Sequence, residues 1–190
     1  MLKLASIFSD HMVLQRDQNV RIWGSAGPKD RIEVSFDKQM KVTQADENGG
    51  WSLFLDPMQA GGPFDLTVKN TSCAIKVHDV MVGEVWLCSG QSNMQFAVKE
   101  CLEANDALSS GNQPRIRLYQ VPLNLSRKPL NELDVRWQLC SPDVLENFSA
   151  AGYFFGRRLH RELDLPVGLI MSAYGGSAAE AWMTEECLRN

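Results

Sequence analysis

The sequence has 190 residues, of which 44% are hydrophobic and 22% are charged, and its formal net charge is -4. This composition is typical of a folded globular protein with enough apolar residues for one good core or two small ones. No run of Lys or Arg offers an attractive surface to phosphate backbones or anionic lipid, so neither nucleic acid nor a membrane is an expected partner. No apolar stretch approaches the roughly 18 residues of a membrane span, and no apolar signal core follows Met1, so we expect a cytoplasmic protein unless a signal was removed.

Five cysteines stand at positions 73, 88, 101, 140 and 187, and none of them forms a C-x-x-C pair. An odd number without such pairs argues against a structural zinc site and against a complete disulfide framework. Cys73 and Cys88 lie in apolar stretches, where a free cysteine behaves as a small hydrophobic residue. We therefore expect most of these thiols to be buried, and we expect no bound metal.

Apolar and polar residues alternate through residues 1–80, as they do in strands with one buried face. Turn-forming residues separate the strands at 24–28, 46–50, 60–63 and 70–72. This pattern predicts an all-β N-terminal domain over residues 1–80, built as a small antiparallel sandwich or barrel. The apolar positions are Val20 and Ile22; Ile32, Val34 and Phe36; Trp51, Leu53 and Leu55; Phe64, Leu66 and Val68; and Cys73, Ile75 and Val77.

From residue 81 onward strand-like runs alternate with helical ones. Strands are predicted at 85–88, 116–121 and 167–171, an amphipathic helix at about 93–108, and a last element at 178–188. A further helix ends at Leu163, and Ser149 is its expected N-cap. Strands that alternate with helices predict βαβ units with a parallel sheet, so residues 81–190 are expected to form an α/β domain.

The predicted α/β domain contains fewer strands than such domains usually have. A parallel sheet normally has five or six strands and both of its faces covered, whereas this region predicts three parallel strands. We therefore expect residues 81–190 to be the N-terminal part of a larger domain. The rest would come from the same protein in a longer form or from another chain.

The turn Gly90-Gln91-Ser92-Asn93 follows the first of these strands and precedes a predicted helix. A serine there presents its hydroxyl at the carboxyl edge of a parallel sheet, where open α/β folds bind ligands. The turn is not the G-x-S-x-G elbow of α/β-hydrolases, because Met94 replaces the second glycine. Ser92 is thus either a nucleophile or an ordinary helix cap, and these residues alone leave both interpretations open.

A second glycine turn, Gly175-Gly176, follows the third predicted strand. Glycine pairs allow backbone N–H groups to face outward, so two such turns at neighbouring strand ends can supply converging donors to an oxyanion. The alternative interpretation is a simple connection between a strand and a helix.

The segment Gly90-Gln91-Ser92-Asn93-Met94 resembles the serine block of the SGNH-hydrolase superfamily in the form used by the sialate O-acetylesterase family. Three other segments resemble the same family, at 8–16 (FSDHMVLQR), 77–84 (VHDVMVGE) and 168–182, which contains Gly175-Gly176 and Glu180-Ala181-Trp182. The resemblance spans nearly the whole chain. It implies that the α/β domain is the first part of a three-layer α/β/α hydrolase fold.

The resemblance also implies roles for individual residues. Ser92 would attack an acetyl ester, with its own N–H and that of Gly175 or Gly176 binding the oxyanion. Gln91, Asn93 and Glu180 are further candidates for binding the oxyanion or the substrate, and no cofactor is needed. The family also uses an asparagine from a third block and a final Asp-x-x-His, and neither block occurs here. The residues three positions before the chain's histidines, His11, His78 and His160, are Phe8, Ile75 and Arg157.

The expected function is therefore hydrolysis of O-acetyl esters of sialic acids by a serine esterase whose base lies outside this sequence. Without that base the chain alone is expected to be almost inactive. One alternative is an esterase for acetylated xylan or another acetylated carbohydrate. A different alternative is a non-catalytic carbohydrate-binding module that uses Trp23, Trp51 and Phe64 as stacking faces.

Overall fold

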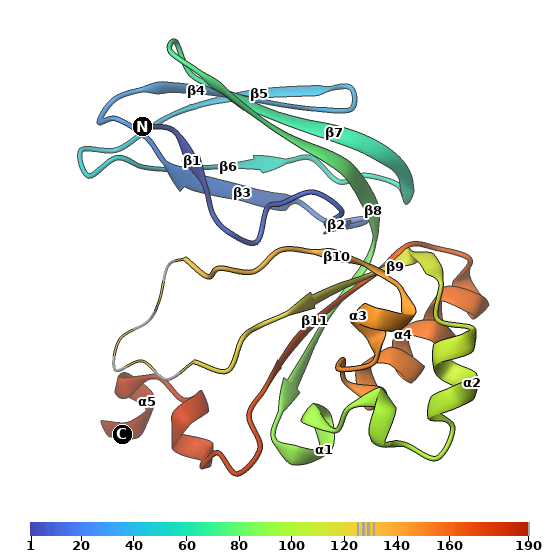
Figure 1. Cartoon of the computed structure of the whole chain (residues 1–190). Coiled ribbons are helices and arrows are strands. Elements are labelled where there is room, and N and C mark those ends of the chain that lie inside the picture. Colours follow the sequence, from blue (N-terminus) through green and yellow to red (C-terminus); the bar gives the residue numbers. More distant parts are fainter. Residues whose placement is uncertain (125, 127, 129, 131, 190) are drawn as a thin grey trace.

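The computed structural model describes residues 1–124, 126, 128, 130 and 132–189, and it consists of a β-sandwich joined to part of an α/β layer structure (Figure 1). No helix in these residues is long and apolar enough to cross a membrane. The strands are β1 (Lys3–Leu4), β2 (Val13–Gln15), β3 (Val20–Ser25), β4 (Arg31–Phe36), β5 (Gln39–Gln44), β6 (Gly50–Leu55), β7 (Gly61–Lys69), β8 (Ala74–Gly90), β9 (Gln113–Gln120), β10 (Gln138–Cys140) and β11 (Val167–Ala173). The helices are α1 (Ser92–Gln95), η1 (Val98–Glu100), α2 (Ala104–Ser109), α3 (Pro142–Leu145), α4 (Ala150–Leu163), η2 (Ala179–Trp182) and α5 (Glu185–Arg189).

The sandwich predicted from the alternating pattern is confirmed. Its first sheet has the strand order β1-β3-β6, and its second is formed by β5, β4, β7 and the first half of β8, with neighbouring strands antiparallel in both. Alternate residues of the two sheets, such as Ile22, Leu55, Val34 and Leu66, are fully buried and pack in one core. Burial of one face of each strand explains why the period of two identified these strands correctly.

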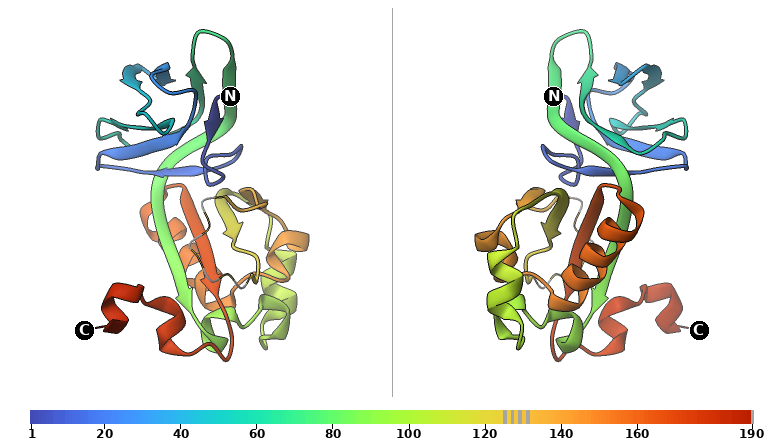
Figure 2. Two further views of the ribbon diagram at one scale, coloured as in Figure 1. Left: turned by 90° about the vertical axis from the view of Figure 1, so that its left-hand side faces the viewer. Right: turned by 90° about the vertical axis from the view of Figure 1, so that its right-hand side faces the viewer.

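Strand β8 continues without interruption from the sandwich into the α/β part (Figure 2). Its first half pairs with β7, and its second half, from Glu84 to Gly90, pairs with β11 in parallel. The domain boundary expected at residue 80 therefore lies inside this 17-residue strand. The strand ends at the turn that carries Ser92.

Two of the segments that carry the family resemblance, 8–16 and 77–84, lie side by side. Strand β2 pairs in parallel with β8, and side-chain bonds flank this ladder. Asp10 Oδ1 accepts the His78 N–H at 2.7 Å, and Arg16 Nε donates to Glu84 Oε1 at 2.7 Å. These contacts join residues 68 positions apart, and they fix the path of β8 between the two parts of the molecule.

A buried arginine links the sandwich to the parallel sheet. Arg117 on β9 is 4% exposed, and its guanidinium donates to both carboxylate oxygens of Asp79, at 2.7 and 3.1 Å. It also donates to the carbonyl oxygens of Pro114 and His11. The His11 Nδ1 lies 2.6 Å from the same carboxylate. Loss of solvation would by itself raise the pKa of Asp79, but the hydrogen bonds from Arg117 and His11 outweigh it and lower that pKa.

The predicted parallel sheet is confirmed, with the order β9-β11-β8 and with β10 antiparallel at its edge. Helices α2, α3 and α4 pack on one face and share a core with Leu118 and Leu169. The other face sends Tyr119 toward the core of the sandwich. Helix α4 begins as predicted, because the Ser149 hydroxyl accepts the Gly152 N–H at 3.0 Å.

Several local predictions were wrong. The helix expected over 93–108 is three short helices, because Ala97 is extended and forms a β-bridge with Ser149, the N-cap of α4. The element expected at 178–188 is two short helices, η2 and α5. Cys73 is exposed, contrary to the expectation that this thiol is buried.

Candidate active site

Ser92 is the first residue of α1 and lies where β8 ends. Gly90 has a φ of +147° and Gln91 occupies the N-cap position, so the chain turns sharply between the strand and the helix. Ser92 is exposed, and its side chain does not cap the helix. The interpretation of Ser92 as an ordinary helix cap is therefore wrong. Within the described residues its hydroxyl has no hydrogen-bond partner.

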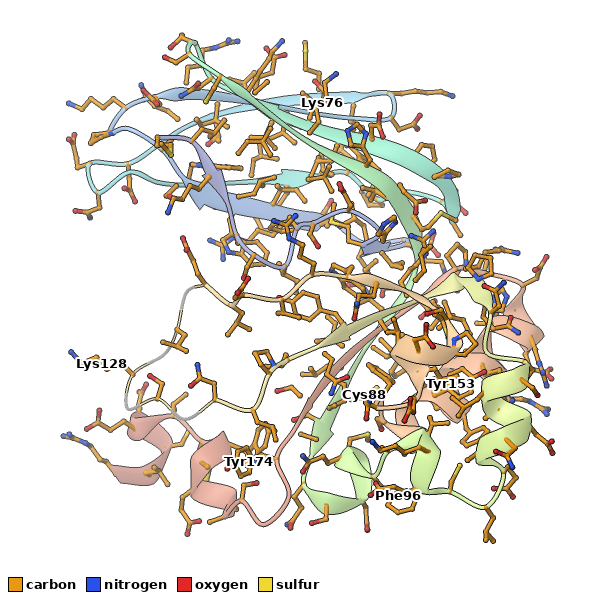
Figure 3. All side chains as sticks on the ribbon, viewed as in Figure 1. Lys76, Cys88, Phe96, Lys128, Tyr153 and Tyr174 are labelled. Carbon is orange, nitrogen blue, oxygen red and sulfur yellow. The ribbon has the colours of Figure 1, made fainter. Side chains whose placement is uncertain are left out.

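The second glycine turn lies next to the first, because β11 and β8 are parallel neighbours in which Ala173 pairs with Gly90. The Tyr174 N–H donates to the Gly90 carbonyl at 3.0 Å, which ties the two turns together. Figure 3 shows Tyr174 and Phe96 at this end of the molecule, on the segments that follow β11 and β8. The two turns thus lie side by side at the carboxyl edge of the sheet.

The two glycines of the second turn have different environments. A Cβ atom on Gly175 would lie 3.2 Å from Ser92 Oγ and 2.8 Å from Gln95 Oε1, so this position faces the serine, and a side chain here would displace the Gln95 amide. The Gly175 N–H donates to Gln95 Oε1 at 2.5 Å. Gly176 has a φ of +75° and faces open space, and its N–H has no acceptor among the described residues.

Electrostatic help from helix α1 is small, because the helix has only four residues. Individual N–H groups, rather than a helix dipole, are the donors available here. Cys88, on the same strand as the serine turn, does not compete as a nucleophile, since it is buried and desolvation raises the pKa of its thiol.

A cavity of about 480 Å³ opens beside Ser92. Its lining includes Gln95, Lys99, Gln120 and Asn147 together with the segment 121–123. The Lys99 ammonium donates to Asn147 Oδ1 at 2.7 Å, so one cation on this wall is held in place. The size and the mixture of polar and apolar groups suit a monosaccharide-sized ligand.

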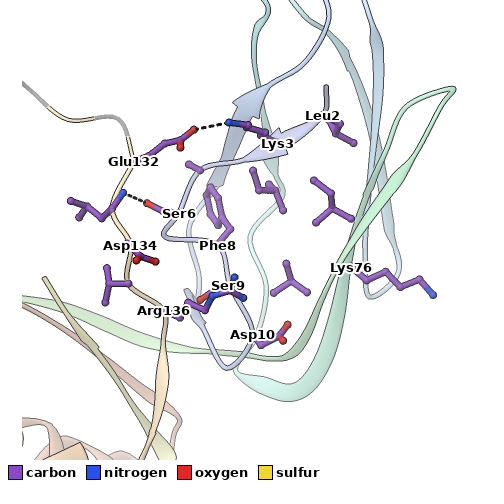
Figure 4. A pocket seen from close by; sticks show the side chains of 16 residues that line it. Leu2, Lys3, Ser6, Phe8, Ser9, Asp10, Lys76, Glu132, Asp134 and Arg136 are labelled. Carbon is purple, nitrogen blue, oxygen red and sulfur yellow. Dashed lines mark hydrogen bonds and ion pairs between the residues drawn. The ribbon is translucent and has the colours of Figure 1, made fainter. Parts of the chain in front are cut away.

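Another cavity of about 490 Å³ lies on the other side of the segment 121–123. Tyr174 and Trp182 line it, and Trp182 Nε1 donates to Ser177 Oγ at 2.9 Å. A third cavity, of about 440 Å³, lies between the start of the chain and residues 132–136 and contains neither Ser92 nor the glycine pair (Figure 4). Of these three cavities, the first has Ser92 in its lining, and the second has Tyr174 and Ser177, which flank the Gly175-Gly176 turn.

The structure does not bring every candidate residue into these cavities. Gln91 and Asn93 are exposed beside Ser92 but line neither of the two cavities, and Glu180 is exposed on η2. Of the proposed sugar-stacking residues, Trp51 is 4% exposed and belongs to the sandwich core, and Trp23 packs edge-on against Phe8.

None of the three histidines lies at Ser92. His11 contacts Asp79, eleven residues before Gly90 on the long strand, which corresponds to a separation on the order of 30 Å. His78 is bonded to Asp65. His160 Nδ1 lies 2.7 Å from the Leu165 carbonyl oxygen near the end of α4, so this ring is held away from Ser92. In the described residues there is also no group of three side chains suited to hold a metal ion.

Sequence reasoning missed Gln95. It stands three residues after Ser92, so one turn of helix places it on the same side, but nothing in the local sequence indicates a partner 80 residues away. Only the arrangement of β8 and β11 as neighbours reveals the contact.

Comparison with known proteins agrees with this arrangement. Residues 82–189, more than half of the chain, match the family described as carbohydrate esterase, sialic acid-specific acetylesterase. The chain is 35% identical to the sialate O-acetylesterase of Mus musculus and 33% identical to that of Homo sapiens, over 98% of its own length. It spans 38% and 40% of those proteins.

A solved structure is similar as well. The crystal structure of a carbohydrate acetylesterase from Xanthomonas citri superimposes with a TM-score of 0.94 at 36% identity, covering 99% of this chain and 44% of that one. The likeness includes both the sandwich and the partial α/β layer structure. The chain belongs to the sialic acid-specific acetylesterase family of carbohydrate esterases.

Proposed function

We propose that Ser92 is the nucleophile of an esterase that removes O-acetyl groups from sialic acids. The observation that carries the proposal is the exposed Ser92 hydroxyl, which has no hydrogen-bond partner in the described residues and lies at the meeting point of two glycine turns. Membership of the family and the names of the relatives support acetylated sialic acid as the substrate.

In the proposed reaction Ser92 Oγ attacks the acetyl carbonyl carbon while a base takes the hydroxyl proton. The carbonyl oxygen becomes an oxyanion, which the N–H groups of Ser92 and Gly176 bind. Gly176 is favoured over Gly175 because the Gly175 N–H already donates to Gln95. The sugar oxygen leaves with a proton, and water then releases acetate from the acetyl-serine. One oxyanion donor contributes about 3 kcal/mol to such a transition state.

The base is the part that these residues do not provide, since each histidine of the chain is engaged elsewhere. Removal of the base from a serine hydrolase lowers kcat by on the order of a millionfold. We therefore infer that the chain by itself hydrolyses acetyl esters very slowly, and that its full activity needs a histidine and an acidic residue from further sequence or from another chain.

Covalent labelling tests the role of Ser92. The complete gene product that carries this chain is treated with a fluorophosphonate, and the modified peptide is identified by mass spectrometry. Labelling is expected at Ser92 and is expected to vanish in Ser92→Ala. The matched control is Ser89→Ala, which changes an exposed serine on β8, three residues before Ser92. Acetate release that persists in Ser92→Ala would contradict the proposal.

The substrate is tested separately. The same gene product is given O-acetylated sialic acid and acetylated xylan, and acetate is measured in both reactions. Release from the sialic acid is expected to dominate. Release from xylan alone would leave the serine mechanism in place and refute the sialate assignment.

A further inference from the structure

The Gln95 side chain connects the two glycine turns. We propose that Gln95 is a positioning residue, which holds the Gly175-Gly176 turn against the Ser92 turn by accepting the Gly175 N–H. Because Gln95 accepts the Gly175 N–H, the oxyanion donor that this turn can still offer is the neighbouring Gly176 N–H. The inference rests on the proposed role of Ser92 as the nucleophile.

The backbone of Gln95 is fixed on both sides. The Gln95 N–H donates to the Gln91 carbonyl at 2.9 Å, and the next N–H, of Phe96, donates to the Ser92 carbonyl at 2.9 Å. The Phe96 carbonyl in turn accepts the Ala150 N–H at 2.8 Å, which anchors this segment to the first turn of α4. The side chain therefore starts from a rigid support that also carries the serine.

The contact itself is specific. An N–H group can only donate, so the oxygen rather than the nitrogen of the Gln95 amide must face Gly175. The distance of 2.5 Å indicates a close bond, and it lies between a partly buried amide and a partly buried side chain. The missing Cβ of Gly175 allows the approach, since a methyl group would lie 2.8 Å from Gln95 Oε1. A side chain without an acceptor would leave the Gly175 N–H unpaired.

A rival interpretation has the opposite consequence. In that case the Gln95 oxygen occupies the place of the acetyl carbonyl oxygen of the substrate. The substrate must then displace it before Gly175 can act as the oxyanion donor. Removal of the amide would then free the donor and keep or raise the rate. In our interpretation the same change loosens the turn, and displacement of an oxyanion donor by a fraction of an ångström lowers kcat.

The first measurement is the hydrogen-exchange rate of backbone amides in the 190-residue chain, with nitrogen-15 NMR as the readout. Gln95→Met keeps the length of the side chain without the acceptor, whereas Gln95→Glu keeps an acceptor. Exchange of the Gly175 amide is expected to accelerate about tenfold or more in the Met variant and to stay near the wild-type rate in the Glu variant. The matched control is Gln44→Met, on β5, whose amide bonds to the Lys29 carbonyl in the sandwich. Equal exchange in the wild type and in Gln95→Met would overturn the proposal.

The second measurement is acetate release by the complete gene product. We expect kcat to follow the order wild type, Gln95→Glu, Gln95→Met, with the Met variant about tenfold or more slower and with KM nearly unchanged. The added charge of the Glu variant opposes the oxyanion, which explains its intermediate position. A Met variant as fast as the wild type would refute the positioning role and favour the rival. If the wild type releases no acetate, the proposed function fails, while exchange of the Gly175 amide still decides whether Gln95 holds the turn.

Discussion

Replacement of Arg117 by Met is expected to destabilise the whole molecule. The substitution keeps a long side chain but removes the donors that bind Asp79 Oδ1 and Oδ2 and the carbonyls of Pro114 and His11. Breaking a buried ion pair by removing one partner costs about 3 to 5 kcal/mol. Because the Asp79 side chain is 31% exposed, water can partly replace the arginine. We therefore expect the free energy of unfolding to fall by about 3 kcal/mol, at the lower end of that range.

The pH dependence of this loss has a definite sign. The pKa of Asp79 is lowered in the folded protein, relative to about 3.9 in an unfolded chain, because the hydrogen bonds from Arg117 and His11 outweigh desolvation. The carboxylate therefore stabilises the fold fully above that unfolded value, and this stabilisation is lost as the pH falls through the lower folded pKa. The difference in the free energy of unfolding between wild type and Arg117→Met is expected to be largest near pH 7 and to decrease below about pH 4.

Urea unfolding followed by tryptophan fluorescence and circular dichroism measures both effects. The matched control is Arg115→Met on the same strand, where Arg115 is 41% exposed and pairs with an 88% exposed Asp164. That exposed pair is expected to contribute less than about 1 kcal/mol. The reasoning would be refuted if Arg117→Met were as stable as Arg115→Met. It would also be refuted if the difference in the free energy of unfolding between wild type and Arg117→Met increased in acid.

Three other substitutions test further contacts. Ser149→Ala removes the cap of α4 and is expected to lower the free energy of unfolding by about 1 kcal/mol in the same urea assay, whereas no change would mean that the hydroxyl is dispensable. Gly156→Ala should lower the free energy of unfolding by about 1 kcal/mol although alanine favours helices, because its Cβ would lie 2.7 Å from Leu169 Cδ1. A variant more stable than the wild type would show that Leu169 moves aside at little cost. Gly175→Ala places a methyl group 3.2 Å from Ser92 Oγ and should slow acetate release by the complete gene product about tenfold or more, and an unchanged rate would argue against a reaction at this turn.

Local patterns were sufficient for the regular parts of the fold. Strands with one buried face are recognisable from the alternation of apolar and polar residues. Ile22 and Leu55 are apolar residues of this pattern, and both are fully buried in the core of the sandwich. Helix α4 was predictable because Ser149 and the apolar spacing act within one element. The location of Ser92 at a strand end also followed from the order of the predicted elements.

Contacts between distant segments decided the rest. Residues 93–108 carry apolar side chains at helical spacing, yet the Val98 N–H donates to the Phe148 carbonyl and the Ala150 N–H donates to the Phe96 carbonyl. These bonds break the helix into short pieces that still bury Val98 and Ala107. The bond between Gly175 and Gln95 belongs to the same class, because it depends on strand order and not on local pattern.

The unbroken strand β8 has a consequence for how this protein can be divided. A cut after Val80, where the pattern of the sequence changes, would remove β2 and β7 and leave the strand that leads to Ser92 without two of its neighbours. The sandwich fragment would lose Met81 to Gly83, which pair with β2 and extend its sheet. Both pieces would expose strand edges that are paired in the intact chain, so the two parts are expected to fold as one unit.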